Sequence, residues 1–407
     1  MRKRNLIILA IVCILSLCFL TGLLVYAFDL QAKEDLKDRN NGQNTENSED
    51  LEDPDTAKVT ASPAPSEPAR DNPAPDQSVS TTPTPTPEPS KPIVLAFAGD
   101  VNFDEDSYPS KKYDAENQDI LGCFSEDLLE EMNSADVMML NNEFAYSTRG
   151  TEETNKSYTF RANPGRVEIL KKMGVDIVSL ANNHALDFGP DALQDTFDTL
   201  EDANIDYVGA GENLDRAKAP VYYTVGDKKI AFVAASHVVF DMSWYASDTK
   251  LGMVGTYDPT LILESIKEAE ANSDFVVIFV HWGVERENYP VDYQRNLAKL
   301  YIDAGADAVI GCHPHVMQGF EYYKGKPIAY SLGNYWFNNS ARETGLFKLY
   351  IDPDDTVRAQ ILPAMGKDTF TYLLTEEDEK KDYVDFMQKL SYNVTIDQDG
   401  FLTETAE

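Results

Sequence analysis

Short apolar runs alternate with amphipathic segments from residue 93 onward, and this alternation constrains the fold more than any other feature of the chain. Each run is mostly hydrophobic and then stops on polar residues; the runs are IVLAFAGD (93–100), ADVMMLNNE (135–143), VDIVSLANNH (175–184), KIAFVAASH (229–237), DFVVIFVHWG (274–283) and DAVIGCHPH (307–315). Apolar spacing predicts intervening helices over 165–174, 190–204, 260–273 and 292–305. Apolar runs separated by helices are typical of an α/β protein with buried strands. We therefore expect an α/β fold.

The N-terminus has the composition of a membrane anchor. Arg2, Lys3 and Arg4 precede an uncharged run from Leu6 to Phe28, and about 20 apolar residues are enough to cross a bilayer. We predict that residues 1–28 are a cytoplasmic basic tip and a single transmembrane signal-anchor, which would place the rest of the chain outside the cell. A cleaved signal peptide is the alternative, and it exports the body equally.

Residues 29–90 read as a disordered stalk. They are polar and acidic at first and then rich in Pro, Ser and Thr, so they cannot bury enough apolar surface to offset the entropy of folding. The proline-rich half favours an extended conformation that rises about 3 Å per residue. This architecture predicts a single-membrane bacterium with a thick wall, and it leaves residues 91–407 as the folded domain.

Charge and cysteine content exclude two classes of protein. The formal net charge is −34, which repels nucleic acid and favours the binding of cations. Of the four cysteines, Cys13 and Cys18 lie in the apolar run, while Cys123 and Cys312 are far apart, so a disulfide framework is not expected. We interpret Cys312 as a small buried residue at a strand end, with a thiolate ligand or nucleophile as the alternative.

Residues of metal-ligand type follow the ends of the apolar runs, where the strands of an α/β sheet present their ligand site. They are Asp100, Asn102, Glu143, Asn183, His184, His281, His313 and His315. A mixed set of carboxylate, amide and imidazole groups suits Mn²⁺, Zn²⁺ or Fe²⁺, and its size suits two ions that share a carboxylate, with Glu143 as the bridge. His237 also follows a run, but no partner motif surrounds it, and we predict a structural role.

The His-Pro-His sequence at 313–315 allows three interpretations from the residues alone: two metal ligands, a catalytic base with its helper, or a polar loop. We favour two ligands. In an extended segment, residues i and i+2 share a face, and Pro314 would stiffen the loop between them.

Six motifs occur in the order AFAGDVNFD, NNEFAYS, SLANNHALDFG, VHWGVE, GADAVIGCHPHVMQGFE and IAYSLGNYWF. Together they resemble the CapA family of capsule (poly-γ-glutamate) biosynthesis proteins, which have a calcineurin-like metallophosphoesterase fold. The resemblance covers about residues 92–337. It implies two mixed β-sheets sandwiched between helices, in a four-layer αββα arrangement.

The resemblance also implies roles for individual residues. Asp100 and Asn102 correspond to an Asp-x-His motif, with Asn102 standing where histidine is usual, and Glu143 replaces the bridging aspartate. Asn183 would bind the second metal, and His184 would act as a general acid or bind the oxyanion. His281, His313 and His315 correspond to the remaining metal ligands.

Three residues are candidates for binding a substrate. Arg161, in YTFRANP, could pair with a carboxylate or phosphate, and Ser331 and Asn334 follow the apolar run of IAYSLGNYWF. The sequence leaves three functions open. The first is a metal-dependent surface enzyme of capsule-polymer synthesis or export. The second is a non-catalytic scaffold that binds an anionic polymer or a membrane-bound synthase. The third is a surface phosphoesterase unrelated to capsule.

Overall fold

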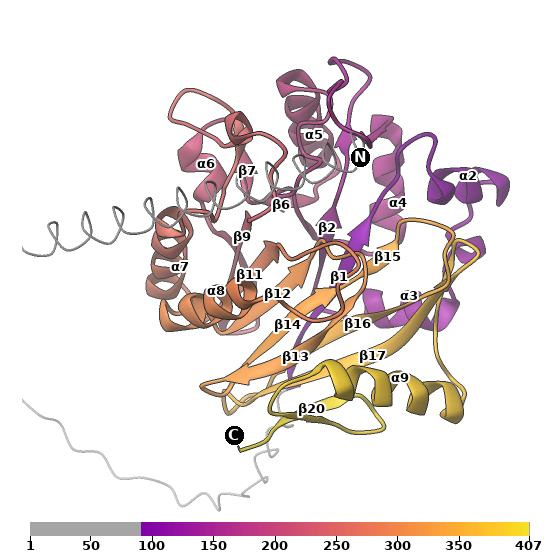
Figure 1. Cartoon of the computed structure of the whole chain (residues 1–407), viewed down its shortest axis with the longest axis vertical. Helices are drawn as coiled ribbons and strands as arrows, with labels where there is room; N and C mark the ends of the chain where they lie inside the picture. Colours follow the sequence, from indigo (N-terminus) through magenta and orange to yellow (C-terminus); the bar gives the residue numbers. More distant parts are fainter. Residues whose placement is uncertain (1–90, 407) are drawn as a thin grey trace, which may run out of the picture. The chain divides into compact units, whose positions relative to one another are not determined.

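Two mixed β-sheets form the centre of the fold (Figure 1). The computed structural model describes residues 91–406, which belong to one compact unit. The larger sheet runs in the order β19 (Val394–Ile396), β20 (Phe401–Glu404), β17 (Val357–Lys367), β16 (Arg342–Ile351), β1 (Ile93–Val101), β2 (Val137–Asn142), β5 (Ile177–Ser179), β6 (Asp206–Val208), with β15 (Asn334–Trp336) paired to β1 and β18 (Phe370–Leu373) paired to β17.

The second sheet has six strands. Its order is β13 (Met317–Tyr323), β14 (Lys326–Leu332), β12 (Ala308–Cys312), β11 (Phe275–His281), β9 (Lys228–Ser236), β8 (Val221–Val225). Both sheets combine parallel and antiparallel pairs. In the larger sheet, β1 is parallel to β2 and antiparallel to β16. In the smaller sheet, the four central strands β9, β11, β12 and β14 are parallel, and the edge strands β8 and β13 are antiparallel to their neighbours. Two short pairs join β3 (Ala145–Tyr146) to β4 (Arg161–Ala162) and β7 (Ala210–Gly211) to β10 (Gly252–Met253).

Helices connect and cover these strands. They are α2 (Tyr108–Ala115), α3 (Glu126–Asn133), α4 (Val167–Lys172), α5 (Pro190–Asp202), α6 (Leu214–Lys218), α7 (Thr260–Asn272), α8 (Asp292–Asp303) and α9 (Glu377–Leu390), with 3₁₀ turns at Ile120–Gly122, Pro164–Arg166 and Met242–Trp244. Helix α5 shows why the sequence forms them: Pro190 occupies the first turn, and Leu193, Phe197 and Leu200 recur at helical spacing and are buried.

Strand alternation divides the core into two layers. In β9, Ile230 and Phe232 belong to the cluster between the sheets, while Ala231 and Val233 belong to a second cluster with helices α7 and α8. Phe232 packs on Phe97 of β1, with ring centroids 6.5 Å apart. The two sheets therefore pack face to face, and α7 and α8 cover the outer face of the smaller one (Figure 1).

The structure confirms a mixed α/β fold with two mixed β-sheets for the described residues. The six apolar runs form β1, β2, β5, β9, β11 and β12, and the four predicted helices are α4, α5, α7 and α8. The predicted anchor at 1–28 and stalk at 29–90 lie outside the described residues. Within 91–406, no helix combines the length and apolar character needed to cross a bilayer.

Candidate metal centre

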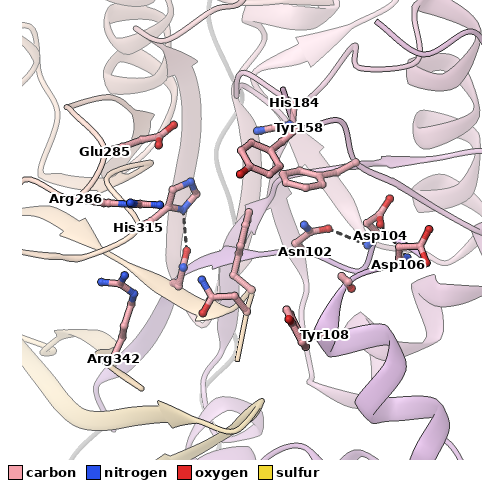
Figure 2. Close-up of a pocket in the computed structure, with 15 residues that line it drawn as sticks. Asn102, Asp104, Asp106, Tyr108, Tyr158, His184, Glu285, Arg286, His315 and Arg342 are labelled. Atoms are coloured by element: carbon pink, nitrogen blue, oxygen red, sulfur yellow. Dashed lines mark hydrogen bonds between the residues drawn. The ribbon is translucent and has the colours of Figure 1, made fainter. Parts of the chain in front are cut away.

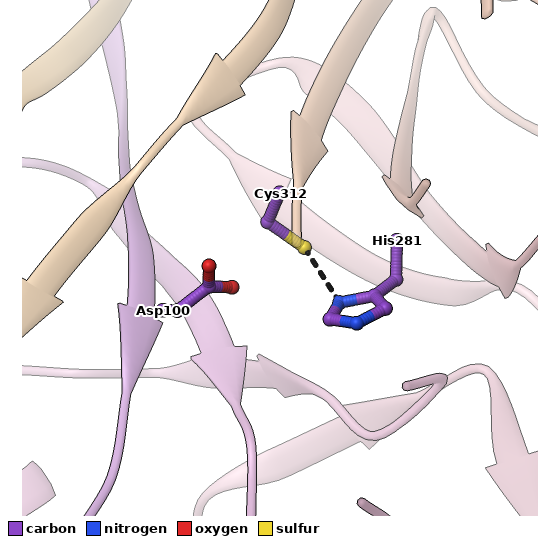
Figure 3. A group of neighbouring side chains, drawn as sticks. All are labelled: Asp100, His281 and Cys312. Carbon is purple, nitrogen blue, oxygen red and sulfur yellow. Dashed lines mark hydrogen bonds between the residues drawn. The ribbon is translucent and has the colours of Figure 1, made fainter. Parts of the chain in front are cut away.

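The alternation of β11 and β12 directs the first ligand-type residues into the space between the sheets. Phe275, Val277 and Phe279 face that space, so the next residue of the same parity, His281, faces it too. His281 is paired in register with Cys312 at the end of β12. Figure 3 shows Asp100, from β1 of the opposite sheet, facing both of them. Ligand atoms of these last three residues lie within 4.8 Å of one another.

Glu143 lies at the middle of the cluster. Its Oε1 atom is 3.7 Å from His281 Nε2, 3.9 Å from His184 Nε2 and 4.0 Å from His315 Nε2. Its Oε2 atom accepts a hydrogen bond of 3.3 Å from Asn141. Oε1 is buried and accepts none from the described residues. A buried carboxylate oxygen among three imidazole nitrogens has the surroundings of a ligand that binds a cation.

The protonation of the cluster follows from its burial. Burial, together with the charge of Asp100, raises the pKa of Glu143 well above its usual range. Burial lowers the pKa of His281 well below its usual value and that of His313 to about 3. These two imidazoles are therefore neutral near pH 7, which is the form that binds metal ions.

Asp100 and His315 form a coupled pair with an Oδ2 to Nδ1 distance of 3.3 Å. Burial alone would raise the pKa of Asp100, but its interactions with His315 outweigh burial and lower it. Burial alone would lower the pKa of His315, but the hydrogen bond and charge of Asp100 raise it. The raised pKa favours the protonated form of His315, whereas a metal ion binds the neutral ring.

Two asparagines complete this part of the cluster. The side-chain oxygen of Asn183 lies 2.7 Å from His281 Nε2, and His313 Nδ1 lies 3.0 Å from the same nitrogen. Asn141 Nδ2 donates to Asp100 Oδ1 at 2.8 Å and lies 3.4 Å from His281 Nδ1. Asn141 was not among the residues predicted from the sequence. Its position two residues before Glu143 was the available signal, because i and i+2 share a strand face.

The His-Pro-His segment is not extended, so that part of the prediction is wrong. His313 and His315 have φ values of 97° and 59°, in the left-handed region that non-glycine residues rarely adopt. The turn is held by hydrogen bonds from His313 N to Asp100 Oδ2 at 3.3 Å and from Arg286 N to Pro314 O at 2.7 Å. The strand ends at Cys312, and the tight turn rather than a pleat brings both imidazoles to the cluster.

His184 is held by a buried ion pair. Its Nδ1 atom lies 2.6 Å from Asp187 Oδ2 and 2.9 Å from Lys156 Nζ, and Lys156 Nζ lies 2.5 Å from Asp187 Oδ1. Lys156 also donates to the backbone oxygen of Asn183, and Phe160 stacks on the His184 ring at 4.3 Å. Burial lowers the pKa of His184, and the hydrogen bond with Asp187 opposes that shift. The Asp187 and Lys156 contacts leave Nε2 directed toward Glu143.

A cavity of about 420 Å³ opens beside the cluster (Figure 2). His184 and His315 line it together with aromatic, acidic, basic and amide side chains. These include Asn102, Asp104, Asp106, Tyr108, Tyr158, Glu285, Arg286, Asn334, Phe337 and Arg342. The cavity is large enough for a small organic anion, and it gives such a molecule access to the metal-ligand cluster.

Of the three candidate substrate-binding residues, one lines the cavity and two do not. Asn334 lines the cavity, and its side-chain oxygen lies 2.8 Å from His315 Nδ1, so it orients that ring. The guanidinium of Arg161 packs on Phe188 and donates to a backbone oxygen. Ser331 is fully buried and donates to Val316 O at 2.8 Å. Neither Arg161 nor Ser331 is among the cavity-lining residues, which corrects both assignments.

Asn102 also differs from its predicted role. It lines the cavity, but its side-chain oxygen accepts a hydrogen bond of 2.8 Å from the backbone N–H of Asp104. In this arrangement the oxygen caps the loop that follows β1. A ligand role for Asn102 would have to use its second lone pair.

Cys312 and His237 are the two remaining residues that the sequence singled out. Burial, with the charges of Asp100 and Glu143, raises the pKa of the Cys312 thiol well above its usual range, so it is not a thiolate nucleophile in the metal-free protein, although its sulfur lies among the possible ligand atoms with Asp100 and His281. His237 packs against Tyr257 and Tyr293 and lies outside the cluster.

Comparison with known proteins gives a family and several relatives. Residues 94–339 match the family described as bacterial capsule synthesis protein PGA_cap. The chain is 35% identical over 218 residues to the PGA biosynthesis protein CapA of Bacillus subtilis (strain 168), covering 52% of this chain and 56% of that protein. It is 33% identical over 219 residues to the capsule biosynthesis protein CapA of Bacillus anthracis, covering 52% and 53%. The chain thus spans a little over half the length of these relatives.

Solved structures with a similar arrangement have low identity. A novel phosphatase from Mycoplasma pneumoniae superposes with a TM-score of 0.42 at 14% identity, covering 68% of this chain and 95% of that one. A hypothetical protein from Thermus thermophilus has a TM-score of 0.40 at 18% identity, covering 67% and 99%.

Proposed function

The chain belongs to the bacterial capsule synthesis protein family, and from this premise we propose that it acts in the synthesis or export of a poly-γ-glutamate-type capsule through a divalent-metal centre of phosphoesterase type. One observation carries the metal centre. Glu143 Oε1 is buried, has no hydrogen-bond partner among residues 91–406, and lies 3.7 to 4.0 Å from three imidazole nitrogens. A cation is the partner that such an oxygen lacks.

The proposed ligand set consists of side chains that meet between the two sheets; it comprises Asp100, Glu143, Asn183, His281, His313 and His315. These donors suit Mn²⁺, Zn²⁺ or Fe²⁺, and their number suits two ions with Glu143 between them. A divalent ion held there would act as a Lewis acid on a phosphoryl oxygen of the substrate.

The chain's own residues supply the proton chemistry and the access route. His184 lines the cavity, and its Nε2 faces the cluster while Asp187 and Lys156 hold the opposite nitrogen. We assign it the role of general acid, or of hydrogen-bond donor to the developing oxyanion.

The proposal includes a location and partners. Residues 1–28 would anchor the chain in the cell membrane by a single pass, residues 29–90 would form an extracellular stalk, and residues 91–407 would lie outside the cell of a single-membrane bacterium. A membrane-bound polymer synthase and the anionic polymer are the proposed partners, and the charge of −34 argues against nucleic acid.

A second candidate is a scaffold that binds metal and polymer without turnover. The occupied oxygen of Asn102 favours it, because the position where a catalytic relative has a histidine here caps a loop. Gene deletion followed by complementation separates the candidates. A catalytic centre requires that the His184→Gln chain, which keeps its metal, fail to restore polymer, whereas a scaffold that binds metal and polymer without turnover would restore it. A phosphoesterase unrelated to capsule would leave polymer unchanged after deletion.

We expect the purified full-length chain to bind about two divalent ions and to hydrolyse a phenyl phosphate ester when Mn²⁺ is supplied. Because metal ions compete with protons for His315 and Glu143, and the pKa values of both groups are raised, affinity should weaken as pH falls. The expected change is about tenfold per pH unit for each displaced proton.

Metal analysis, calorimetry in two buffers of different ionisation enthalpy, and phosphate release measure these effects. A folded chain that retains no transition metal at pH 8 would contradict the metal centre. Metal binding without phosphate release would favour the scaffold.

A further inference from the structure

Two arginines line the cavity without a side-chain partner among the described residues. Arg286 follows β11 in a loop, and Arg342 is the first residue of β16 (Figure 2). Within residues 91–406, neither side chain takes part in a salt bridge or hydrogen bond, and the Nε of Arg342 is buried with no partner. A guanidinium has five N–H donors and keeps its charge, so burying one unpaired donor costs free energy.

The other arginines of the described chain all donate to an oxygen. Arg149, Arg166, Arg295 and Arg358 pair with carboxylates, and Arg161 and Arg216 donate to backbone oxygens. The two arginines that lack such a partner line the same cavity, where Arg286 is exposed and Arg342 is half-buried with a buried Nε that has no partner among residues 91–406. An anion that enters the cavity would supply that partner.

Arg286 and Arg342 line the same cavity as His184 and His315 of the metal-ligand cluster. The backbone N–H of Arg286 donates to Pro314 O at 2.7 Å, which ties it to the turn that carries His313 and His315. Arg286 has a φ of 65°, a conformation that a non-glycine residue adopts only when its surroundings hold it. In Figure 2, Arg286 lies beside His315, and Arg342 lies on the same side of the cavity.

Acidic side chains lie on the opposite side of the cavity. Asp104 and Asp106 lie across the cavity from the arginines in Figure 2, and both oxygens of Asp104 accept hydrogen bonds from backbone N–H groups. Glu285 lies on the arginine side without an ion pair to either arginine among the described contacts. Both positive charges of the lining arginines are therefore on one side of the cavity, where they attract an anionic group.

We propose that Arg286 and Arg342 form an anion subsite, so that the substrate carries at least two anionic groups: one at the metal centre and a second, carboxylate or phosphate, on the arginines. This inference rests on the proposed function, because the metal centre is taken to bind the first group. A guanidinium binds either oxyanion through paired hydrogen bonds. Arg342 lies beyond residue 339, where the family match ends, so the subsite includes a residue outside that match.

Binding of two kinds of probe to the Mn²⁺-loaded full-length chain tests the subsite. Phenylphosphonate carries one anionic group, and 3- and 4-carboxyphenylphosphonate add a carboxylate; none of them can be hydrolysed. We expect at least one carboxylated probe to bind about tenfold or more tightly than phenylphosphonate, as measured by calorimetry. Arg342→Met and Arg286→Met should each remove most of that gain and leave phenylphosphonate binding unchanged, while the lysine variants should keep part of it.

Arg358→Met is the matched control, because it removes the same charge from β17 outside the cavity and should change neither affinity. Thermal unfolding of each variant shows whether it is folded, and Arg342→Lys serves if Arg342→Met is not. Equal affinity of the wild-type chain for all three probes, or a gain that survives both methionine variants, overturns the subsite and leaves the metal centre standing. Failure of every probe to bind the Mn²⁺-loaded chain overturns the phosphoesterase role proposed for the metal centre as well.

Discussion

Glutamine in place of Glu143 is expected to lower the affinity for the divalent ion about 100-fold or more, and to abolish hydrolysis with it. The substitution keeps the shape of the side chain and removes the negative charge at the centre of the imidazole nitrogens. Metal content after dialysis against a defined Mn²⁺ concentration measures the effect. Retention of wild-type metal by the folded variant would contradict the central role of this carboxylate.

In the metal-free chain, Glu143→Gln is expected to reduce the loss of folding stability that occurs as pH rises. Folding raises the pKa of Glu143, so the folded chain favours the protonated form of this side chain. The stability that this preference contributes is fully present at pH values below the unfolded pKa. It is lost as pH rises through the folded pKa. The metal-free wild-type chain should therefore lose more stability than Glu143→Gln between acidic and mildly alkaline pH. Added metal should stabilise only the wild-type chain.

Glu321 offers a matched control for this comparison. It is also buried, but Arg295 and Lys299 pair with it, and Tyr330 donates to it at 2.9 Å. Burial alone would raise its pKa, but the hydrogen bonds of Arg295 and Tyr330 lower it, so its contribution is present above its unfolded pKa and lost as pH falls. Glu321→Gln should destabilise the fold at neutral pH and leave metal binding intact. Urea unfolding across pH distinguishes the two variants by the sign of the change.

Replacement of His184 by glutamine is expected to lower kcat by about 10²- to 10⁴-fold while the metal content stays at the wild-type level. The reason is geometric: His184 faces the cluster from the cavity wall and is held from behind by Asp187 and Lys156. Steady-state hydrolysis and metal analysis on the same preparation provide both numbers. Loss of metal together with activity would instead make His184 a ligand.

Asp187→Asn tests how His184 is positioned. The carboxylate of Asp187 raises the pKa of His184 against the effect of burial, so its loss should lower that pKa further. If His184 acts as an acid, activity falls as pH rises through its pKa, and in the variant this fall should occur at lower pH. A purely structural role for Asp187 would reduce activity without moving the pH profile.

The sequence predicted the parts of this protein that depend on local pattern. The six apolar runs between residues 93 and 315 mark buried strands, and the carboxyl ends of parallel strands meet at one edge, so Asp100, Glu143 and His281 could be grouped from the order of runs and polar residues alone. Their shared burial between the sheets agrees with that grouping.

The remaining features depend on contacts between distant segments. Lys156 reaches Asp187 across a loop, and no periodicity relates them. The left-handed turn at His313 and His315 is fixed by partners on β1 and in the Arg286 loop. Arg161 was a candidate because a guanidinium can pair with a carboxylate or phosphate, but in the structure its guanidinium packs on Phe188.

The pairing of β16 with β1 shows that the folded domain extends beyond the region that matches the family. The family match ends at residue 339, yet β16 begins at Arg342 and runs antiparallel along Ile93–Phe97, the half of β1 that leads to Asp100. A chain shortened to the matched region would leave that strand with an open edge, which is a template for aggregation. The region that matches the family is therefore smaller than the folding unit. The segment after residue 339 belongs to the sheet that positions Asp100.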